Sequence, residues 1–145
     1  MTQALGIVVV VLYAAMILLL LRVRPTVLSL QFTYSSAAFH RVASSWTAGD
    51  LRRVRQHFIL DFPFLASYAA FGWSVASDLR GSVSPHMQYF LLAAALCDAF
   101  ENVIHVSYLA KPERSMPNTL ALLTGTASTC KYALGLIFIA EWIAA

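Results

Sequence analysis

Charged residues are scarce in this chain. Only 12% of its 145 residues are Asp, Glu, Lys or Arg, whereas 59% are hydrophobic and the mean hydropathy is +0.69. A soluble domain carries about 25% charged residues, so the composition indicates a membrane protein. The net charge is only +3, and the basic residues do not suggest a nucleic-acid-binding patch, so we expect no nucleic-acid partner.

Cysteine is scarce too, and several functional motifs are absent. Cys97 and Cys130 both lie in apolar segments, which suggests small buried residues and no disulfide framework. No Lys or Arg precedes the apolar stretch that begins at Leu5, so we expect a retained membrane helix and not a signal peptide. The sequence has no nucleophile elbow, phosphate-binding loop or Cys-pair zinc motif, and it predicts no cofactor.

Long apolar runs dominate what is present. Four of them are long enough to cross a bilayer, at about residues 5–21, 58–76, 87–110 and 120–143. A transmembrane helix needs roughly 17 to 25 such residues, and its backbone groups must bond within the helix. The sequence therefore predicts an all-α fold: a four-transmembrane-helix bundle that forms one integral membrane domain over residues 1–145.

The connection between the first two spans, residues 26–57, has a helical pattern of its own. Apolar side chains recur at helical spacing, as in an amphipathic helix that lies in the membrane interface, at Phe39, Val42, Ala43 and Trp46. We expect Ser35 or Ser36 to cap this helix and Gly49 to end it. Asp50 is then expected to cap the next helix. Two hypotheses remain for the segment: a linker with a solvated basic face, or a lid or lipid-head-group clamp over an interior site.

The positions of Lys and Arg predict the orientation. Six Arg residues lie within 22–57, and Lys111 and Arg114 follow the third span, whereas the opposite side has only Arg80. The positive-inside rule places connections 22–57 and 111–118 in the cytoplasm and both termini outside, in the inner cell membrane. Turn signals separate the later spans, at Gly81, Ser82, Pro85, Pro112 and Pro117.

Four polar residues interrupt the third apolar run: Asp98, Glu101, Asn102 and His105. Their spacing of i, i+3, i+4 and i+7 places them on one helix face. Each charged, unpaired group costs about 2.5 to 3.5 kcal/mol inside a membrane. We therefore expect this face to point into the bundle, toward polar partners on the second and fourth spans.

Depth in the membrane, counted at ~1.5 Å per residue, predicts those partners. Lys131 matches Asp98 in depth and has the opposite charge, and Asp61 matches His105. Glu101 has no obvious opposite charge at its depth. The fourth span also carries small and polar residues at helical spacing, which predicts close packing against the third span, at Thr124, Ser128, Lys131 and Gly135.

Several functions fit such an interior. The polar groups can be interhelical bonds, which average about 0.6 kcal/mol in membrane proteins. They can also perform acid–base or proton-transfer chemistry, with Glu101 as general acid or base, Asp98 held ionised by Lys131, and His105 exchanging protons with the cytoplasmic side. A metal held by Glu101 and His105 with Asp61 or Asp98, or a transport pathway, is a further alternative, but the spacing is generic and we predict no metal site.

We interpret the protein as an integral membrane protein whose polar interior binds a hydrophobic small molecule, with membrane lipid as its other partner. Acid–base chemistry at Asp98, Glu101 and His105 is a hypothesis on the same site. Other ligand or network residues are Asp61, Tyr68, Asn102, Ser128 and Lys131. An apolar cavity is expected between Phe64, Tyr68, Phe71, Trp73 and Phe100. The alternative is a non-catalytic accessory or assembly subunit with protein partners in a larger membrane complex, its polar residues serving only to hold the helices together.

Two segments carry a resemblance to known proteins. Residues 60–63 (Leu-Asp-Phe-Pro) with Tyr68, and residues 98–102 (Asp-Ala-Phe-Glu-Asn), resemble the LDF…P…Y and D-x-x-E-N signatures of a group of small bacterial four-span membrane proteins. The likeness covers about residues 28–108 and implies the topology but no activity. In architecture the chain is also similar to the sterol-isomerase and sigma-2-receptor-like fold, which implies an acidic pair facing a sterol-sized pocket. The long basic first connection departs from that fold.

Overall fold

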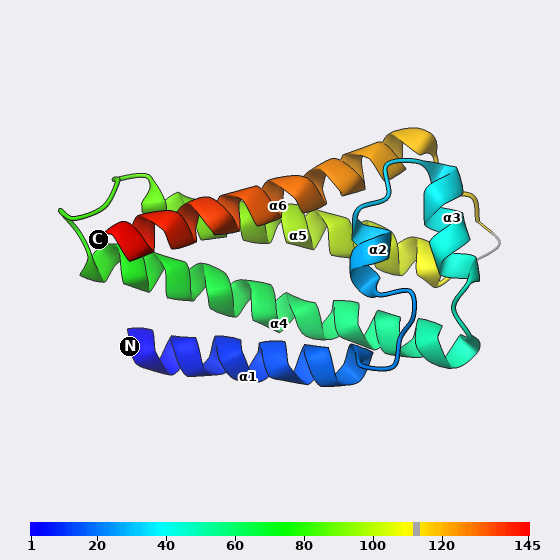
Figure 1. The fold of residues 1–145 in the computed structure, drawn as a ribbon, viewed down its shortest axis with the longest axis horizontal. Coiled ribbons are helices and arrows are strands. Elements are labelled where there is room, and N and C mark those ends of the chain that lie inside the picture. Colours follow the sequence, from blue (N-terminus) through cyan, green and yellow to red (C-terminus); the bar gives the residue numbers. More distant parts are fainter. Residues whose placement is uncertain (112–113) are drawn as a thin grey trace.

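The computed structural model describes residues 1–111 and 114–145, and within these ranges the chain is helical with no strands (Figure 1). Its helices are α1 (Thr2–Leu20), α2 (Val27–Gln31), α3 (Ser36–Ser44), α4 (Ala48–Asp78), α5 (Met87–Leu109) and α6 (Asn118–Ala144). Of these, α1, α4, α5 and α6 are long and apolar enough to cross a membrane. The predicted all-α, four-span bundle is confirmed. The turn expected at Pro112 lies outside the described residues.

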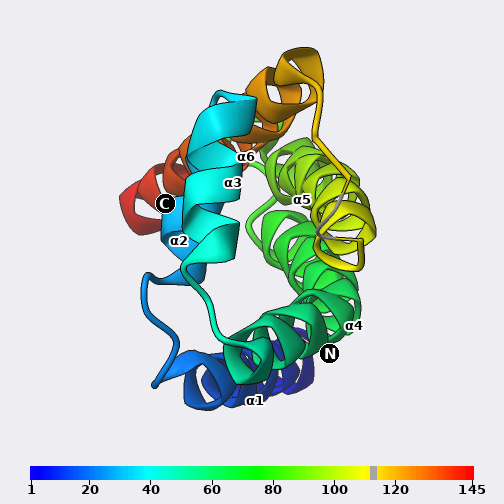
Figure 2. The same ribbon diagram turned by 90° about the vertical axis from the view of Figure 1, so that its right-hand side faces the viewer.

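The four long helices pack in chain order, α1 on α4, α4 on α5 and α5 on α6. Both termini lie at one end of the bundle, and α2 and α3 lie at the other (Figure 1). Viewed from that second end, the long helices form an open arc, and α2 and α3 lie across its open side between α6 and α1 (Figure 2). The first connection therefore covers the open side of the arc at this end of the bundle.

The first connection is built around two buried aromatic side chains, as its amphipathic pattern predicts. The Ser35 hydroxyl accepts a hydrogen bond from the Ala38 N–H and caps α3, while Phe39 and Trp46 are buried. The Trp46 indole N–H donates to the Pro25 carbonyl at 2.8 Å. The apolar core at this end joins the first connection, and the one between α5 and α6, to α4, α5 and α6. Its buried residues are Val23, Val27, Leu30, Phe39, Trp46, Val54, Phe58, Tyr108, Leu109, Met116 and Ala121.

The boundary between α3 and α4 differs from the expected one. The Thr47 hydroxyl accepts from the Asp50 N–H, and the Asp50 carboxylate accepts from the Thr47 N–H, which forms a capping box. Thr47 is therefore the N-cap, and Asp50 is the third helical residue. Gly49 lies in the first turn of α4 and does not end α3, which ends at Ser44. The reciprocal bonds satisfy two N–H groups that a helix start leaves free, which outweighs the helix-ending tendency of glycine.

At the other end, aromatic side chains close the bundle. The Phe71 ring meets the Trp142 ring edge-on, with centroids 5.9 Å apart, and Phe138 of α6 is buried beside Val75 and Met87. The Thr2 hydroxyl donates to the Asp78 carboxylate at 2.6 Å and fixes the start of α1 on α4. The interior between the two ends is therefore blocked at the terminal end by side chains of α4 and α6.

The tightest approach of α4 and α5 generates a stability prediction. A Cβ atom at Gly72 would lie 2.7 Å from Cδ1 and 2.8 Å from Cβ of Leu91, and the latter atom cannot rotate away. Gly72→Ala is therefore expected to lower the free energy of unfolding by about 1 to 3 kcal/mol, as overpacking does in well-packed cores.

The matched control is Gly135→Ala in α6, where an added Cβ meets nothing within 4 Å. Without a clash, alanine is favoured over glycine in a helix by up to about 1 kcal/mol. Thermal unfolding in detergent should therefore separate the two variants, and equal melting temperatures would contradict the close crossing at Gly72.

Candidate functional site

The polar face of α5 points into the bundle, as its spacing predicts. The exposed fraction is 5% for Asp98 and 0% for Glu101, Asn102 and His105. The apolar residues on the outer side of the same helix are exposed, with Leu96 at 66% and Phe100 at 43%. The helix therefore turns its costly polar groups away from the surrounding hydrocarbon and toward α4 and α6.

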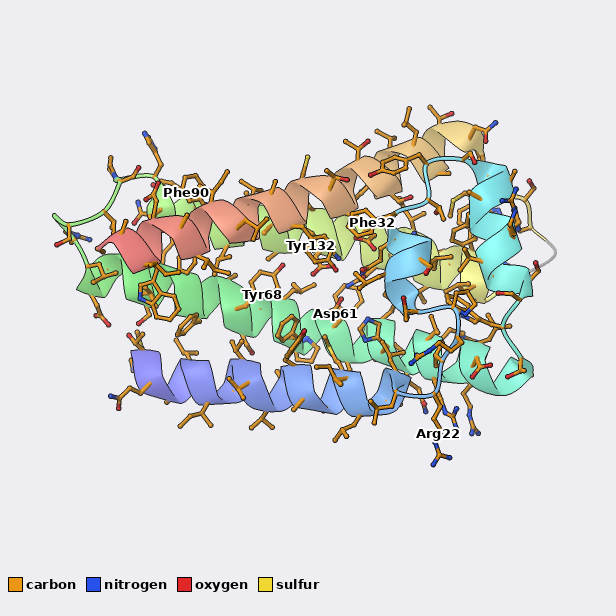
Figure 3. The ribbon with its side chains drawn as sticks, in the orientation of Figure 1. Arg22, Phe32, Asp61, Tyr68, Phe90 and Tyr132 are labelled. Atoms are coloured by element: carbon orange, nitrogen blue, oxygen red, sulfur yellow. The ribbon has the colours of Figure 1, made fainter. Side chains whose placement is uncertain are left out.

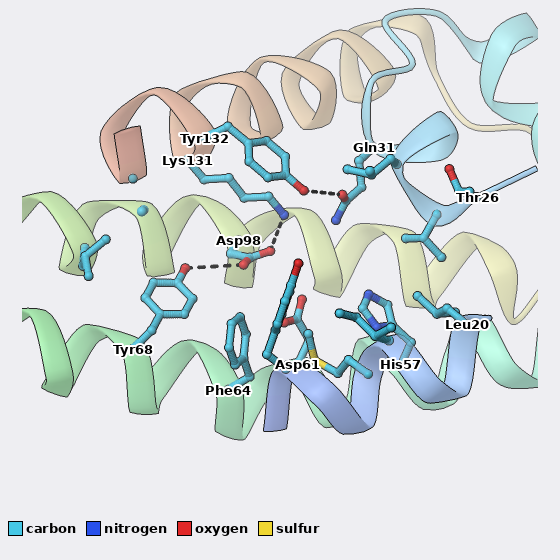
Figure 4. Close-up of a pocket in the computed structure, with 18 residues that line it drawn as sticks. Leu20, Thr26, Gln31, His57, Asp61, Phe64, Tyr68, Asp98, Lys131 and Tyr132 are labelled. Carbon is cyan, nitrogen blue, oxygen red and sulfur yellow. Dashed lines mark hydrogen bonds and ion pairs between the residues drawn. The ribbon is translucent and has the colours of Figure 1, made fainter. Parts of the chain in front are cut away.

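Lys131 of α6 binds two carboxylates of α5. Its ammonium donates to Asp98 Oδ1 at 2.6 Å (Figure 4). The same ammonium lies 2.9 Å from Glu101 Oε2. The predicted Asp98–Lys131 pair is confirmed, but the expectation that Glu101 has no opposite charge is wrong. Asp98 and Glu101 lie one helical turn apart, and the long lysine side chain brings its three donors between them.

Asp61 and His105, expected to pair with each other, have other partners. Asp61 Oδ2 accepts from the Asn102 side-chain amide at 2.8 Å. His105 Nδ1 lies 3.4 Å from Glu101 Oε1, an i, i+4 neighbour on its own helix. Equal depth in the membrane therefore did not decide the pairing. His105 lies closer to Glu101 on its own helix, and the Asn102 side chain reaches Asp61 on α4.

His105 is enclosed by aromatic rings at the end of the bundle that α3 covers. Its ring stacks on Phe39 of α3, with centroids 5.6 Å apart, and lies 5.4 Å from the Phe58 ring of α4. None of its surface is exposed. The hypothesis that His105 exchanges protons with the cytoplasmic side is therefore not supported by its position, because α3 covers it.

A cavity of about 480 Å³ lies beside this network, between α1, α2, α4, α5 and α6 (Figure 4). Its lining is mostly apolar and aromatic: Tyr13, Met16, Ile17, Leu20, Thr26, Val27, Leu28, Gln31, His57, Asp61, Phe64, Tyr68, Leu91, Ala94, Asp98, Lys131, Tyr132 and Gly135. The volume lies within the range of small-molecule sites, about 300 to 1,000 Å³. The cavity is therefore large enough for a small organic ligand.

Two of the five aromatic residues expected around the cavity line it, Phe64 and Tyr68. The other three do not. Phe71 packs against Trp142, while Trp73 and Phe100 are 45% and 43% exposed on the outer surface. In their place α1 and α2 form one wall, which the sequence did not reveal because α1 is apolar on every side.

The cavity divides the predicted site residues into two groups. Asp61 and Tyr68 extend from α4 into the interior (Figure 3) and line the cavity together with Asp98 and Lys131. Behind its wall lie Glu101, Asn102, His105 and Ser128. The hydroxyl of Tyr68 donates to Asp98 Oδ2 at 3.4 Å (Figure 4). Ser128 instead donates to the backbone carbonyl of Thr124 on its own helix, at 3.0 Å.

The sequence interpretation missed five polar lining residues: Tyr13, Thr26, Gln31, His57 and Tyr132. The hydroxyl of Tyr132 donates to Gln31 Oε1 at 3.0 Å and joins α6 to α2. His57 had a usable signal, because it stands four residues before Asp61 on the face of α4 that also carries Phe64 and Tyr68. Its ring atom Nδ1 is buried and has no hydrogen-bond partner among the described residues.

Within residues 1–111 and 114–145, no three His, Cys, Asp or Glu side chains gather closely enough to hold a metal ion. No protein-family model matches the chain, and searches of curated proteins and of solved structures find no significant match. The resemblances noted in the sequence therefore stay predictions.

The shared lysine generates a coupling prediction. Asp98→Asn and Lys131→Met should each destabilise the bundle, the latter by about 3 to 5 kcal/mol because it leaves two buried carboxylates without their cation. The double variant should lose less than the sum of the two, with a coupling of about 0.5 to 3 kcal/mol in a thermodynamic cycle of unfolding.

The control is the solvent-facing pair of Arg53 and Asp50, whose charged atoms lie 3.7 Å apart. The same cycle there should give a coupling of at most about 1 kcal/mol, as for other surface ion pairs. Additive losses for Asp98 and Lys131 would show that their contact contributes nothing to folding.

Proposed function

We propose that this integral membrane protein binds a hydrophobic small molecule in the cavity between α1, α2, α4, α5 and α6. One observation carries the proposal: a mostly apolar cavity of ligand size meets buried charged groups, Asp61, Asp98 and Lys131, on one wall. Ligand sites combine these features, an apolar lining for affinity and a few convergent polar groups for orientation. A cavity that served only helix packing would have no need of charged groups at its wall.

The position of the cavity supports a ligand that comes from the lipid phase. Several lining residues of α1 and α6 are also exposed on the outer surface, among them Tyr13 at 54%, Ile17 at 44% and Tyr132 at 40%. In a membrane these side chains face acyl chains. A molecule dissolved in the bilayer therefore reaches the cavity sideways, between α1 and α6, without crossing water.

Acid–base chemistry, if the ligand undergoes any, falls to the carboxyl groups that touch the cavity. Asp61 and Asp98 are in a position to exchange a proton with a bound molecule, and Tyr68 is placed to orient it through Asp98. Glu101 and His105 stand behind Lys131 and the wall of aromatic rings. We assign them to the support of Lys131 and not to direct contact with a ligand.

Gly135 provides the test of the cavity as a binding site. It lines the cavity, and an added Cβ there meets nothing within 4 Å, so Gly135→Leu should place its side chain in the empty space. We expect native mass spectrometry of the wild-type protein, extracted gently from its own membrane, to show a retained small-molecule mass. The Gly135→Leu variant should lose that mass and keep its helical content.

The control is Leu136→Phe, which enlarges the side chain of the next residue, 68% exposed on the outside. It should retain the small molecule. A small-molecule mass retained equally by wild type and Gly135→Leu would place the ligand elsewhere. A retained protein in place of a small molecule would favour the alternative function, an accessory subunit of a larger membrane complex.

We also propose that the end with α2 and α3 faces the cytoplasm and that both termini lie outside. Arg52 is exposed at that end of α4, and Arg80 is exposed just beyond the opposite end of the same helix. In a chain whose Cys97 and Cys130 are replaced by alanine, Arg52→Cys should react with a membrane-impermeant maleimide only after the membrane is opened. Arg80→Cys should react in intact cells, and the reverse pattern would invert the topology.

A further inference from the structure

The charged side chains that line the cavity are more acidic than basic, and this balance bears on the charge of the ligand. Two carboxyl groups, Asp61 and Asp98, line the cavity with one lysine ammonium, Lys131, and a third carboxyl group, Glu101, lies behind the wall, 2.9 Å from that ammonium. Lys131 is already held by Asp98 and Glu101, and Glu101 also faces His105 at 3.4 Å. Of the three carboxyl groups, Asp61 is therefore the one with no cation against it among the described residues.

The surroundings of Asp61 leave room for a cation from the ligand. Asp61 is 3% exposed and lines the cavity, and its hydrogen-bond donor in the described chain is the neutral amide of Asn102, at 2.8 Å. One turn earlier on α4, His57 also lines the cavity (Figure 4), and its Nδ1 has no partner in the described part of the protein. An acidic oxygen and an unused imidazole nitrogen thus lie along the same wall.

Aromatic side chains complete these surroundings. Phe64 follows Asp61 by three residues, stacks against Tyr13 of α1 with ring centroids 6.0 Å apart, and meets the Tyr68 ring at 5.2 Å. All three rings line the cavity. The faces of aromatic rings attract cations, most of all where water is excluded.

We propose that the ligand of this cavity is a lipophilic amine, whose protonated nitrogen binds the Asp61 carboxylate. The hydrocarbon part of the amine then lies between α1 and α6 against Ile17, Leu20 and Leu91. A fatty acid or another lipid anion fits the same wall poorly, because its carboxylate would meet Asp61 and Asp98 while Lys131 is already occupied. This inference rests on the proposed function and adds the charge of the ligand to it.

The test uses three probes that share one alkyl chain and differ in the head: N,N-dimethyldodecylamine, 1-dodecanol and dodecanoate. Each is titrated into the full-length protein in lipid nanodiscs at neutral pH, and binding is followed by native mass spectrometry. The amine should bind about tenfold or more tightly than the alcohol, as expected for one buried charge-assisted hydrogen bond. Dodecanoate should bind most weakly.

Asp61→Asn keeps the size of the side chain and an oxygen that can accept the hydrogen bond from Asn102, but it removes the negative charge. In this variant the amine should lose its advantage, while the alcohol binds as in wild type. Glu141→Gln is the matched control: it removes a carboxylate outside the cavity lining, one that accepts from the Ser84 N–H at 3.3 Å, and should leave the preference unchanged.

The outcomes separate the two proposals. Equal binding of amine and alcohol to the wild type, both blocked by Gly135→Leu, would overturn the amine inference and keep the binding site. An amine preference that persists in Asp61→Asn would exclude Asp61 as its cause. Failure of the wild type to bind any of the three probes would count against the proposed function itself. If Asp61→Asn does not fold, the wild-type series alone still decides the charge preference.

Discussion

The contact on which the interior depends is the Lys131 ammonium between Asp98 and Glu101. An unpaired charge costs several kcal/mol in a membrane, so the charges of α5 and of α6 would each destabilise their helix if they had no partner. Together they form a compact group in which one cation serves two anions and His105 lies against the second. The group fixes the rotation of α5 and α6 about their own axes, because any other rotation turns a charge toward lipid.

The Lys131 group constrains only α5 and α6. The cavity lies on the other side of the arc, toward α1. The helix α1 packs on α4, and Met16 is its only buried residue among those described. No charge draws α1 toward α6. The space between them is spanned by α2. The Tyr132–Gln31 hydrogen bond joins α2 to α6. Just after α2, the backbone carbonyl of Thr33 approaches α6 so closely that only a glycine fits at position 125. Gly135 also lines the cavity, and because it has no side chain the space beside it stays open.

The sequence predicted the spans, the inward face of α5 and the Asp98–Lys131 pair, because each follows from the cost of polar groups in hydrocarbon. It misassigned Glu101, since depth counting treats a side chain as a point at its Cα, and a lysine side chain reaches past one helical turn. The role of α1 could not be predicted, because a helix that is apolar on all sides has no face to read. The start of α4 depended on a reciprocal bond between Thr47 and Asp50 that competes with the glycine signal.

The two sides of the Lys131 group have different consequences. On the inner side Glu101 and His105 are fully buried beneath Phe39 and Phe58, where only a rearrangement of α3 would expose them. On the cavity side Asp98 and its neighbour Asp61 meet open space between aromatic rings. A purely structural network gains nothing from the open space on one side, because an unfilled cavity loses packing contacts and lowers stability. The cavity beside Asp61 is therefore the part of the interior that stability does not explain, and it is where function should be sought.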